Sequence, residues 1–262
     1  MKVKIACLAT AVCLLSQCGL PINAFEIPFL SDLFDPRTVS LPVDFTDQQN
    51  FKYVLPFKRA ETLFVNNGTQ LENFLSPKWF PRVWDICITL KVEQNEAASL
   101  MNVISRNYSD IKQLSIIQNY NIDVKAIPFL KKFSNLRTLA LEFPTDNLEL
   151  LRDSLPKNTK ELMLGESNLA NQNEVGLDLP NIKKLDVRGD TIAPGFLAHS
   201  NFPALKEVFL GNSVLKEGAA REFAKFKSLR KIEMCHTEMS AEDVQFLKEH
   251  GIKAFDPNDP DD

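Results

Sequence analysis

A short hydrophobic pattern recurs through most of this chain. The stretch LPNIKKLDVRGDTI places apolar residues at Ile182, Leu185 and Val187, with charged residues in most of the gaps between them. The same apolar-x-x-apolar-x-apolar spacing returns in segments that begin at the following residues: Ala60, Val83, Ile111, Leu136, Thr159, Leu205 and Leu229. Successive copies start 23, 28, 25, 23, 23, 23 and 24 residues apart, and the fourth and sixth positions are apolar in all eight. Such a period predicts a repeat architecture, because one short copy cannot bury its own apolar side chains.

Each copy predicts a short strand followed by a helical or irregular connection. The alternation of apolar and polar residues within a copy has the two-residue period of a strand. The connection GAAREFAKF instead spaces Ala219, Phe223 and Phe226 at helical intervals. Ser240 is a suitable N-cap for a last helix, AEDVQFLKEH, and Gly251 is a suitable end for it. We therefore expect a single α/β solenoid, with parallel strands along one side and helical or irregular segments along the other.

The repeated pattern resembles that of the leucine-rich repeat family, L-x-x-L-x-L-x-x-N/C-x-L. The resemblance covers about residues 60–256 and is strongest in the six copies from Ile111 to Met239. It implies a right-handed superhelix with a concave parallel β-sheet, and a protein that binds other proteins. The ninth position matches the family at Asn119 but departs from it in the last four copies, which hold the short polar residues Ser167, Asp190, Ser213 and Thr237. Such side chains can still hydrogen-bond the backbone of the loops.

The repeats lie between two ends of different character. At the N-terminus, Lys2 and Lys4 precede an apolar run too short to span a bilayer, which is the layout of a secretory signal peptide. We expect cleavage after Ala24; the alternative is lipid attachment at Cys18, as in a bacterial lipoprotein. The expected organisation is a signal peptide (1–24), an N-terminal cap without a repeat (25–59), about eight repeats (60–239), a capping helix with a broken ninth repeat that starts at Ile252 (240–256), and an acidic disordered tail (257–262).

The expected location is therefore outside the cytoplasm, as a secreted or periplasmic protein, with a membrane-anchored lipoprotein as the less favoured alternative. No run in the mature chain is long enough to span a membrane. Removal of residues 1–24 leaves only Cys87 and Cys235. Six strand spacings, roughly 30 Å, separate these two in the expected sheet, which is too far for a disulfide. Two unpaired thiols count modestly against an oxidising compartment.

Few residues in the sequence suggest catalysis. The three histidines, His199, His236 and His250, do not have the spacing of metal ligands. Cys235 stands next to His236, but adjacent residues of a strand point to opposite faces, so neither a shared metal nor a Cys–His nucleophile is expected. We therefore expect no enzymatic activity, no cofactor and no metal site.

The face expected to lie open to solvent carries a strip of basic residues. The second position is basic in six successive copies: Lys112, Arg137, Lys160, Lys183, Lys206 and Arg230. One interpretation is a strip that meets an acidic or phosphorylated partner. The other is that these charges serve solubility and are largely neutralised by nearby acidic residues, which are Glu161, Asp186, Glu207 and Glu233. Nucleic acid is not the expected partner, because the chain has a net charge of −4 and the strip has few aromatic residues.

Apolar residues on the same face predict where a protein partner binds. Phe143, Met163 and Phe209 stand there, with Ile117 nearer one end. Aromatic residues and Met beside Arg are typical of binding hot spots. We expect a partner to dock over the fourth to seventh copies and to contact the following residues: Phe143, Met163, Lys160, Lys183, Arg188, Lys206, Phe209 and Arg230. The alternative function is an envelope-anchored structural spacer attached through Cys18.

Overall fold

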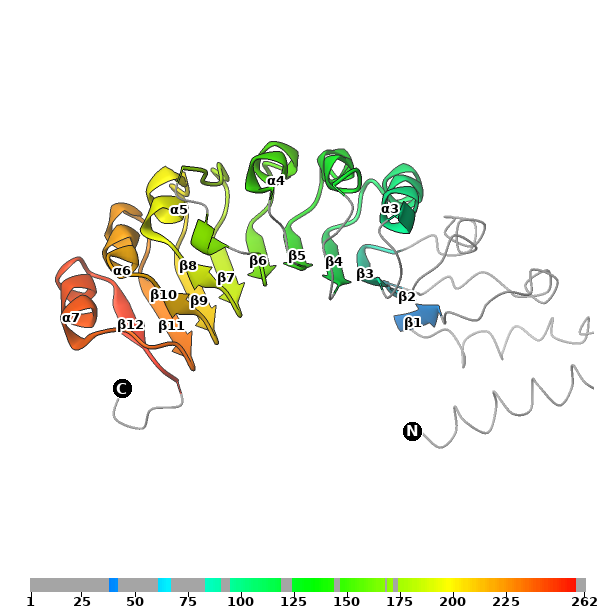
Figure 1. Cartoon of the computed structure of the whole chain (residues 1–262). Coiled ribbons are helices and arrows are strands. Elements are labelled where there is room, and N and C mark those ends of the chain that lie inside the picture. The colour runs from blue at the N-terminus through cyan, green and yellow to red at the C-terminus, as the bar shows by residue number, and fades with distance from the viewer. Residues whose placement is uncertain are drawn as a thin grey trace, which may run out of the picture.

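The chain forms an open, parallel β-sheet with helices along one side (Figure 1). The computed structural model describes residues 38–41, 61–66, 83–90, 95–118, 124–143, 147–167, 169–171 and 174–257. Ten strands of the sheet lie side by side in the order of the sequence. They are β1 (Thr38–Leu41), β2 (Thr62–Asn66), β3 (Asp85–Leu90), β4 (Gln113–Gln118), β5 (Thr138–Glu142), β6 (Glu161–Gly165), β7 (Lys184–Arg188), β9 (Glu207–Gly211), β11 (Lys231–Cys235) and β12 (Lys253–Phe255).

The connections run along the outer side of the arc that the strands form (Figure 1). Within the described ranges, the α-helices are α3 (Asn95–Asn107), α4 (Leu148–Ser154), α5 (Pro194–His199), α6 (Ala219–Glu222) and α7 (Ala241–Glu249). The 3₁₀ helices are η4 (Ile127–Lys132), η5 (Leu169–Asn171) and η6 (Phe223–Lys225). Two further strands, β8 (Thr191–Ile192) and β10 (Val214–Leu215), pair in parallel as a separate small sheet. The expected combination of a parallel sheet with helical connections is confirmed.

The strands pair in the register that the repeat predicts. Ile86 pairs with Leu63 on one side and with Leu114 on the other. The same fourth position continues across the sheet through Leu139, Leu162, Leu185, Val208 and Ile232. Each of these side chains is at most 2% exposed. Since full burial of such a side chain stabilises the fold by about 1.5–3 kcal/mol, this stack joins the copies into one core.

Both ends of the sheet differ from the expectation. β1 lies within the segment 25–59, where we expected no repeat, and its Val39 pairs with Leu63. At the other end Ala254, and not Phe255, pairs with Ile232, so the last copy is one residue out of the expected register. The turn after α7 explains this shift, because the N–H of Ile252 donates to the carbonyl of Leu247 and the Ile252 side chain is buried.

The polar ninth position connects neighbouring loops. The buried carboxylate of Asp190 accepts hydrogen bonds from the backbone N–H groups of Ser167 (2.7 Å) and Leu169 (3.2 Å). The Thr237 hydroxyl accepts from the N–H of Ser213 at 3.0 Å and donates to the carbonyl of Leu210 at 3.2 Å. Each of these side chains therefore reaches back to the preceding copy, as expected for short polar residues at this position.

The predicted helices of the last copies are confirmed. Ala219 of α6, Phe223 of η6 and Phe226 just after η6 are all buried in the core. The hydroxyl of Ser240 accepts from the N–H of Asp243 at 3.1 Å and caps α7, while Gly251 follows the helix with a φ of +77°.

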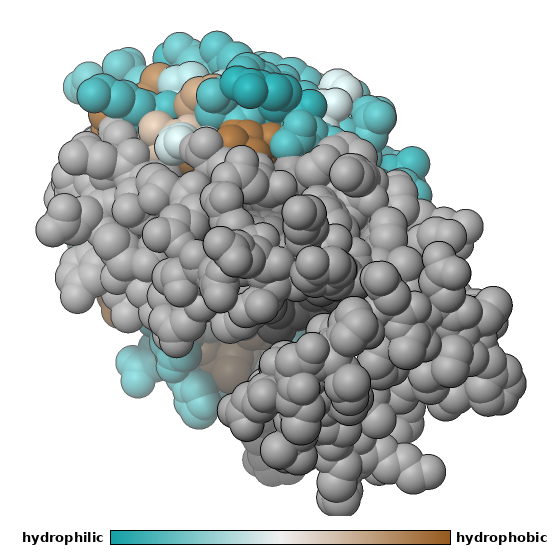
Figure 2. All heavy atoms as spheres, turned by 90° about the vertical axis from the view of Figure 1, so that its right-hand side faces the viewer, coloured by the Kyte–Doolittle hydropathy of each residue, from teal (hydrophilic) through white to brown (hydrophobic). Residues whose placement is uncertain are grey.

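The expectations for the N-terminus concern residues outside the described ranges. Ala24 and Cys18 lie there, as do the segment 1–24 and residues 258–262 of the tail. Among the described helices, none has the length and apolar character needed to cross a membrane. Figure 2 views the molecule from the right-hand side of Figure 1, near β1, and the described residues visible in it are mostly hydrophilic, with a few apolar ones between them.

Candidate protein-binding surface

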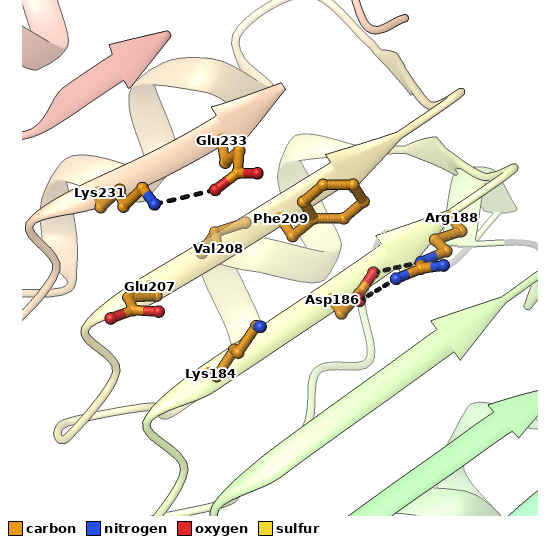
Figure 3. Close-up of a pocket in the computed structure, with 8 residues that line it drawn as sticks. All are labelled: Lys184, Asp186, Arg188, Glu207, Val208, Phe209, Lys231 and Glu233. Carbon is orange, nitrogen blue, oxygen red and sulfur yellow. Dashed lines mark hydrogen bonds and ion pairs between the residues drawn. The ribbon is translucent and has the colours of Figure 1, made fainter. Parts of the chain in front are cut away.

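The side of the sheet opposite the helices, which we call the open face, carries polar and half-buried side chains in its middle. A hollow of about 270 Å³ lies on strands β7, β9 and β11 (Figure 3). It is lined by Lys184, Asp186, Arg188, Glu207, Val208, Phe209, Lys231 and Glu233. The third, fifth and seventh positions of neighbouring copies supply all of these except Val208, because alternate residues of a strand point to the same face.

Arg188 is held in one orientation by two neighbours. Its Nε donates to Oδ1 of Asp186 at 2.9 Å and its Nη2 donates to Oδ2 at 2.8 Å. The Asp186 side chain is only 9% exposed, whereas that of Arg188 is 51% exposed. The hydrogen bonds that Arg188 donates to Asp186 raise the pKa of Arg188 above its ordinary value, so the guanidinium stays charged. The guanidinium also lies over the Phe209 ring, 5.1 Å from its centroid, which is a cation–π distance (Figure 3).

Gly211 makes room for this group. Arg188 pairs with Gly165 of β6 and with Gly211 of β9, so it stands between two positions without side chains. A Cβ on Gly211 would lie 2.8 Å from Cε1 of Phe209 and 3.5 Å from Cγ of Arg188. The glycine therefore lets the aromatic ring lie against the arginine. The sequence signal for this arrangement is a Gly–Arg–Gly series at the seventh position of three successive copies.

A second hollow, of about 240 Å³, adjoins the first at the C-terminal ends of the strands. Its lining residues are Ile117, Glu142, Gly165, Glu166, Arg188, Gly189 and Asn212. Arg188 lines both hollows. Its guanidinium is therefore accessible from two sides at the middle of the open face.

The six basic residues of the second position form a continuous line, which we call the basic row. Each backbone N–H donates to the carbonyl of the corresponding residue in the preceding copy, at 2.7–2.9 Å. The members of the basic row are all exposed, and they are Lys112, Arg137, Lys160, Lys183, Lys206 and Arg230. The row therefore crosses six neighbouring copies without interruption.

The acids near the basic row form their direct contacts with other residues. Asp186 pairs with Arg188, and Glu233 pairs with Lys231 at 2.9 Å. Glu161 accepts a hydrogen bond from the Thr138 hydroxyl at 3.4 Å. Within the described ranges, none of the ion pairs includes a residue of the basic row. Asp186 and Glu233 therefore form ion pairs with residues of the third and seventh positions and not with the basic row.

Phe143 is a core residue, which corrects its assignment as a contact for a partner. It is 1% exposed and packs within the hydrophobic core. The alternation of faces ends with β5 at Glu142, so the eighth position no longer points to the open face. At this position Glu166, Asn212 and His236 have positive φ angles and are exposed, whereas Phe143 has no positive φ and turns inward.

The other expected contact residues keep exposed surface. Lys160, Lys183, Lys206 and Arg230 belong to the basic row, and Arg188 is exposed on β7. Met163 and Phe209 are half-buried on β6 and β9. The structure brings Arg188 and Phe209 into contact, and it places Met163 beside Asp186 on the neighbouring strand.

Phe255 is a residue of the open face that the sequence analysis missed. It pairs with Glu233 at the fifth position, and two ammonium groups lie near its ring, Lys253 at 4.5 Å and Lys231 at 5.0 Å. A last copy that starts at Ile252 would place Phe255 at the buried fourth position. The correct spacing is one residue shorter.

The remaining candidate groups for chemistry lie apart. In the described ranges, no three side chains of His, Cys, Asp or Glu gather as they would around a metal ion. Neither Cys87 nor Cys235 forms a disulfide. Burial raises the pKa of Cys87, and the nearby charges of Asp85 and Glu142 raise it further. A raised pKa favours the thiol form, which is the less nucleophilic one.

Comparison with known proteins leaves this surface without an assignment. No protein-family model matches the chain, and no curated protein matches it. Any function of this surface therefore has to be inferred from its own residues. These are an arginine held against an aromatic ring and a line of exposed basic side chains.

Proposed function

We propose that the chain is a leucine-rich-repeat solenoid that binds a protein partner through its open face, without catalysis. The 23-residue period, the sequential parallel strands and the in-register stack at the fourth position support this interpretation. The right-handed coil and the concave shape of the sheet are parts of the same proposal. The face opposite the helices is then the natural contact surface, because it is built from side chains of every copy.

The observation that carries the proposal is the group formed by Arg188, Asp186 and Phe209. Arginine and aromatic residues dominate the binding energy of protein interfaces, and replacing one at a hot spot costs about 2 kcal/mol or more. Ordering a long side chain during binding costs about 0.5–1.5 kcal/mol. Asp186 and Phe209 already restrict Arg188, so part of this cost is met when the chain folds.

The partner, in this proposal, docks over β6, β7, β9 and β11. Met163 and Phe209 supply half-buried apolar surface there, and Arg188 supplies a charged group between the two hollows. Lys160, Lys183, Lys206 and Arg230 border this area at the N-terminal ends of the strands. The mixture of apolar anchors with charged neighbours matches the core and rim of a standard interface.

The test is affinity capture of a protein from the native extract, with the double variant Phe209→Ala and Met163→Ala as the comparison. Both side chains are only half-buried, so we expect capture to be lost while the melting temperature changes little. Val214→Ala is the matched control, because Val214 is 60% exposed and lies on β10, outside the ten-stranded sheet. Equal capture by wild type and the double variant would refute the proposed surface, and a collapse of the melting temperature would show that the two residues belong to the core.

We further propose that the protein is exported, as a secreted or periplasmic protein, after cleavage at Ala24. The proposal rests on the charged start and short apolar run of residues 1–24. Mass spectrometry of the protein from its native source tests it. A chain that begins at Phe25 supports release, whereas a diacylated Cys18 would replace it with the envelope-anchored spacer. An intact Met1 would contradict both routes.

A further inference from the structure

We propose that the partner presents an acidic polypeptide segment, whose carboxylates lie along the basic row. This inference rests on the proposed function, because it names the chemistry of the protein that the open face binds. It follows from three properties of the row, namely its continuity, the absence of its side chains from the ion pairs of the described residues, and the composition of the open face beside it.

The row has the dimensions of a short peptide. Five strand spacings of about 4.8 Å separate its first and last residues, which gives a length of roughly 24 Å. An extended segment of about seven residues covers that distance at about 3.4 Å per residue. Alternate side chains of such a segment point the same way, so three or four carboxylates can face the row.

The row is electrostatically unfavourable in the free protein. Like charges that stand opposite each other on neighbouring strands repel and destabilise a sheet. Here six basic side chains follow one another, and the described ion pairs include none of them. The whole chain has a net charge of −4, so general basicity does not explain this concentration. Carboxylates of a partner would relieve the repulsion and gain attraction at the same time.

The rest of the open face favours a polypeptide over a nucleic acid. Glu142, Glu207 and Glu233 stand on the same face, and they would repel a polyphosphate chain that crossed it. The rings of Phe209 and Phe255 already have cationic side chains over them, which limits stacking of bases. A polypeptide can place acids at the row and apolar side chains at Phe209, about three residues further along each strand.

The test measures binding of a fluorescent twelve-residue Glu-rich peptide to the purified full-length chain by anisotropy. The row variant carries Lys160→Glu, Lys183→Glu and Lys206→Glu. The matched control carries Arg106→Glu, Lys131→Glu and Lys248→Glu, which make the same change in net charge at exposed residues of α3, η4 and α7. We expect the row variant to weaken binding about tenfold or more and the control to stay within about twofold. Binding to wild type should weaken strongly between about 0.02 M and 0.15 M salt.

Three results would overturn the inference. They are the absence of peptide binding to wild type, an equal loss of peptide affinity in the row variant and the control, and tighter binding of a twelve-nucleotide oligouridylate than of the peptide.

The capture assay separates this inference from the proposed function. A row variant that loses the Glu-rich peptide but still captures its protein partner refutes the acidic segment and leaves the open face as the binding surface. Failure of wild type to capture any protein refutes the proposed function itself.

Discussion

Removal of the Asp190 side chain should cause a large loss of folding free energy for so small a group. Its carboxylate accepts from the backbone N–H groups of Ser167 at 2.7 Å and Leu169 at 3.2 Å, and it is 5% exposed. Both donors belong to the preceding copy and are themselves buried. The substitution Asp190→Ala therefore leaves two buried N–H groups without this acceptor.

The expected loss follows from the cost of unsatisfied donors. Each buried N–H left without a partner costs about 1–3 kcal/mol, so the pair gives about 2–6 kcal/mol. Relief of the desolvated carboxylate offsets part of this, and we expect about 3 kcal/mol. Asp190→Asn keeps one carbonyl acceptor and should cost about half as much. Ser213→Ala is the control at the same position, because the Ser213 hydroxyl donates only to the carbonyls of Val187 and Gly211 and its loss should cost about 1 kcal/mol.

Urea denaturation followed by circular dichroism measures the difference. With a slope of about 3 kcal/mol per molar urea, a loss of about 3 kcal/mol lowers the midpoint by about 1 M. Repeat proteins can unfold in segments, so amide hydrogen exchange at Ser167 and Leu169 provides a local measurement that does not assume a two-state transition. If Asp190→Ala is no more destabilising than Ser213→Ala, the ninth-position side chains do not join the copies as the structure indicates.

Three further predictions concern other parts of the fold. Gly176→Ala should unfold the chain or lower its melting temperature severely, because the new Cβ would meet the backbone of His199 and Ser200. Gly165→Ala is the control and should have a small effect on the melting temperature, since its Cβ would meet the flexible Glu142 side chain at 3.3 Å. Burial, and after it the charge of Asp85, raises the pKa of Cys87. Iodoacetamide should therefore alkylate Cys87 more slowly at pH 8 than it alkylates an ordinary exposed thiol, and faster in Asp85→Asn than in wild type. Mass spectrometry measures both rates. Hydrogen bonds from Lys157 and Asn201 lower the pKa of Asp178 in the folded chain, so its stabilisation is present above the unfolded pKa of about 3.9 and is lost as the pH falls through the folded value. Asp178→Asn should therefore lower the free energy of unfolding near neutral pH by less than about 1 kcal/mol for this exposed pair, and the resulting difference in melting temperature should vanish in acid.

The spacing of apolar residues was sufficient to predict the sheet, because the same pattern satisfies two independent requirements. Alternation within a copy determines which side chains are buried, and the 23-residue period determines which residues of neighbouring copies meet. Leu162 pairs with Leu185, and Leu185 with Val208, as both requirements demand. A slip by one residue would turn every buried side chain of a strand to the open face, so the register is strongly specified.

The ends of the sheet were predicted less well, because an end strand has only one neighbour to constrain it. Val39 and Leu41 follow the pattern within the segment where no copy was expected, but β1 has only four residues and no preceding copy with which to compare it. At the other end, the helix α7 and the turn at Gly251 fix where Ile252 enters the core, and this shortens the last spacing by one residue. Local helix geometry, and not the period, determines the register there.

The candidate site was predicted in part, and the errors share one physical cause. Positions within a strand were assigned correctly, so Arg188 and Phe209 lie on the open face as expected, and the residues of the basic row, which precede the strands, are exposed. Phe143 lies one residue beyond β5, where the direction of a side chain depends on the backbone turn and no longer on alternation. The pairing of Asp186 with Arg188 likewise depends on which of several nearby bases the carboxylate can reach with good geometry, and a sequence does not specify this distance. That pairing holds Arg188 beside Phe209, so the charged part of the proposed contact surface on β7 and β9 depends on this single contact.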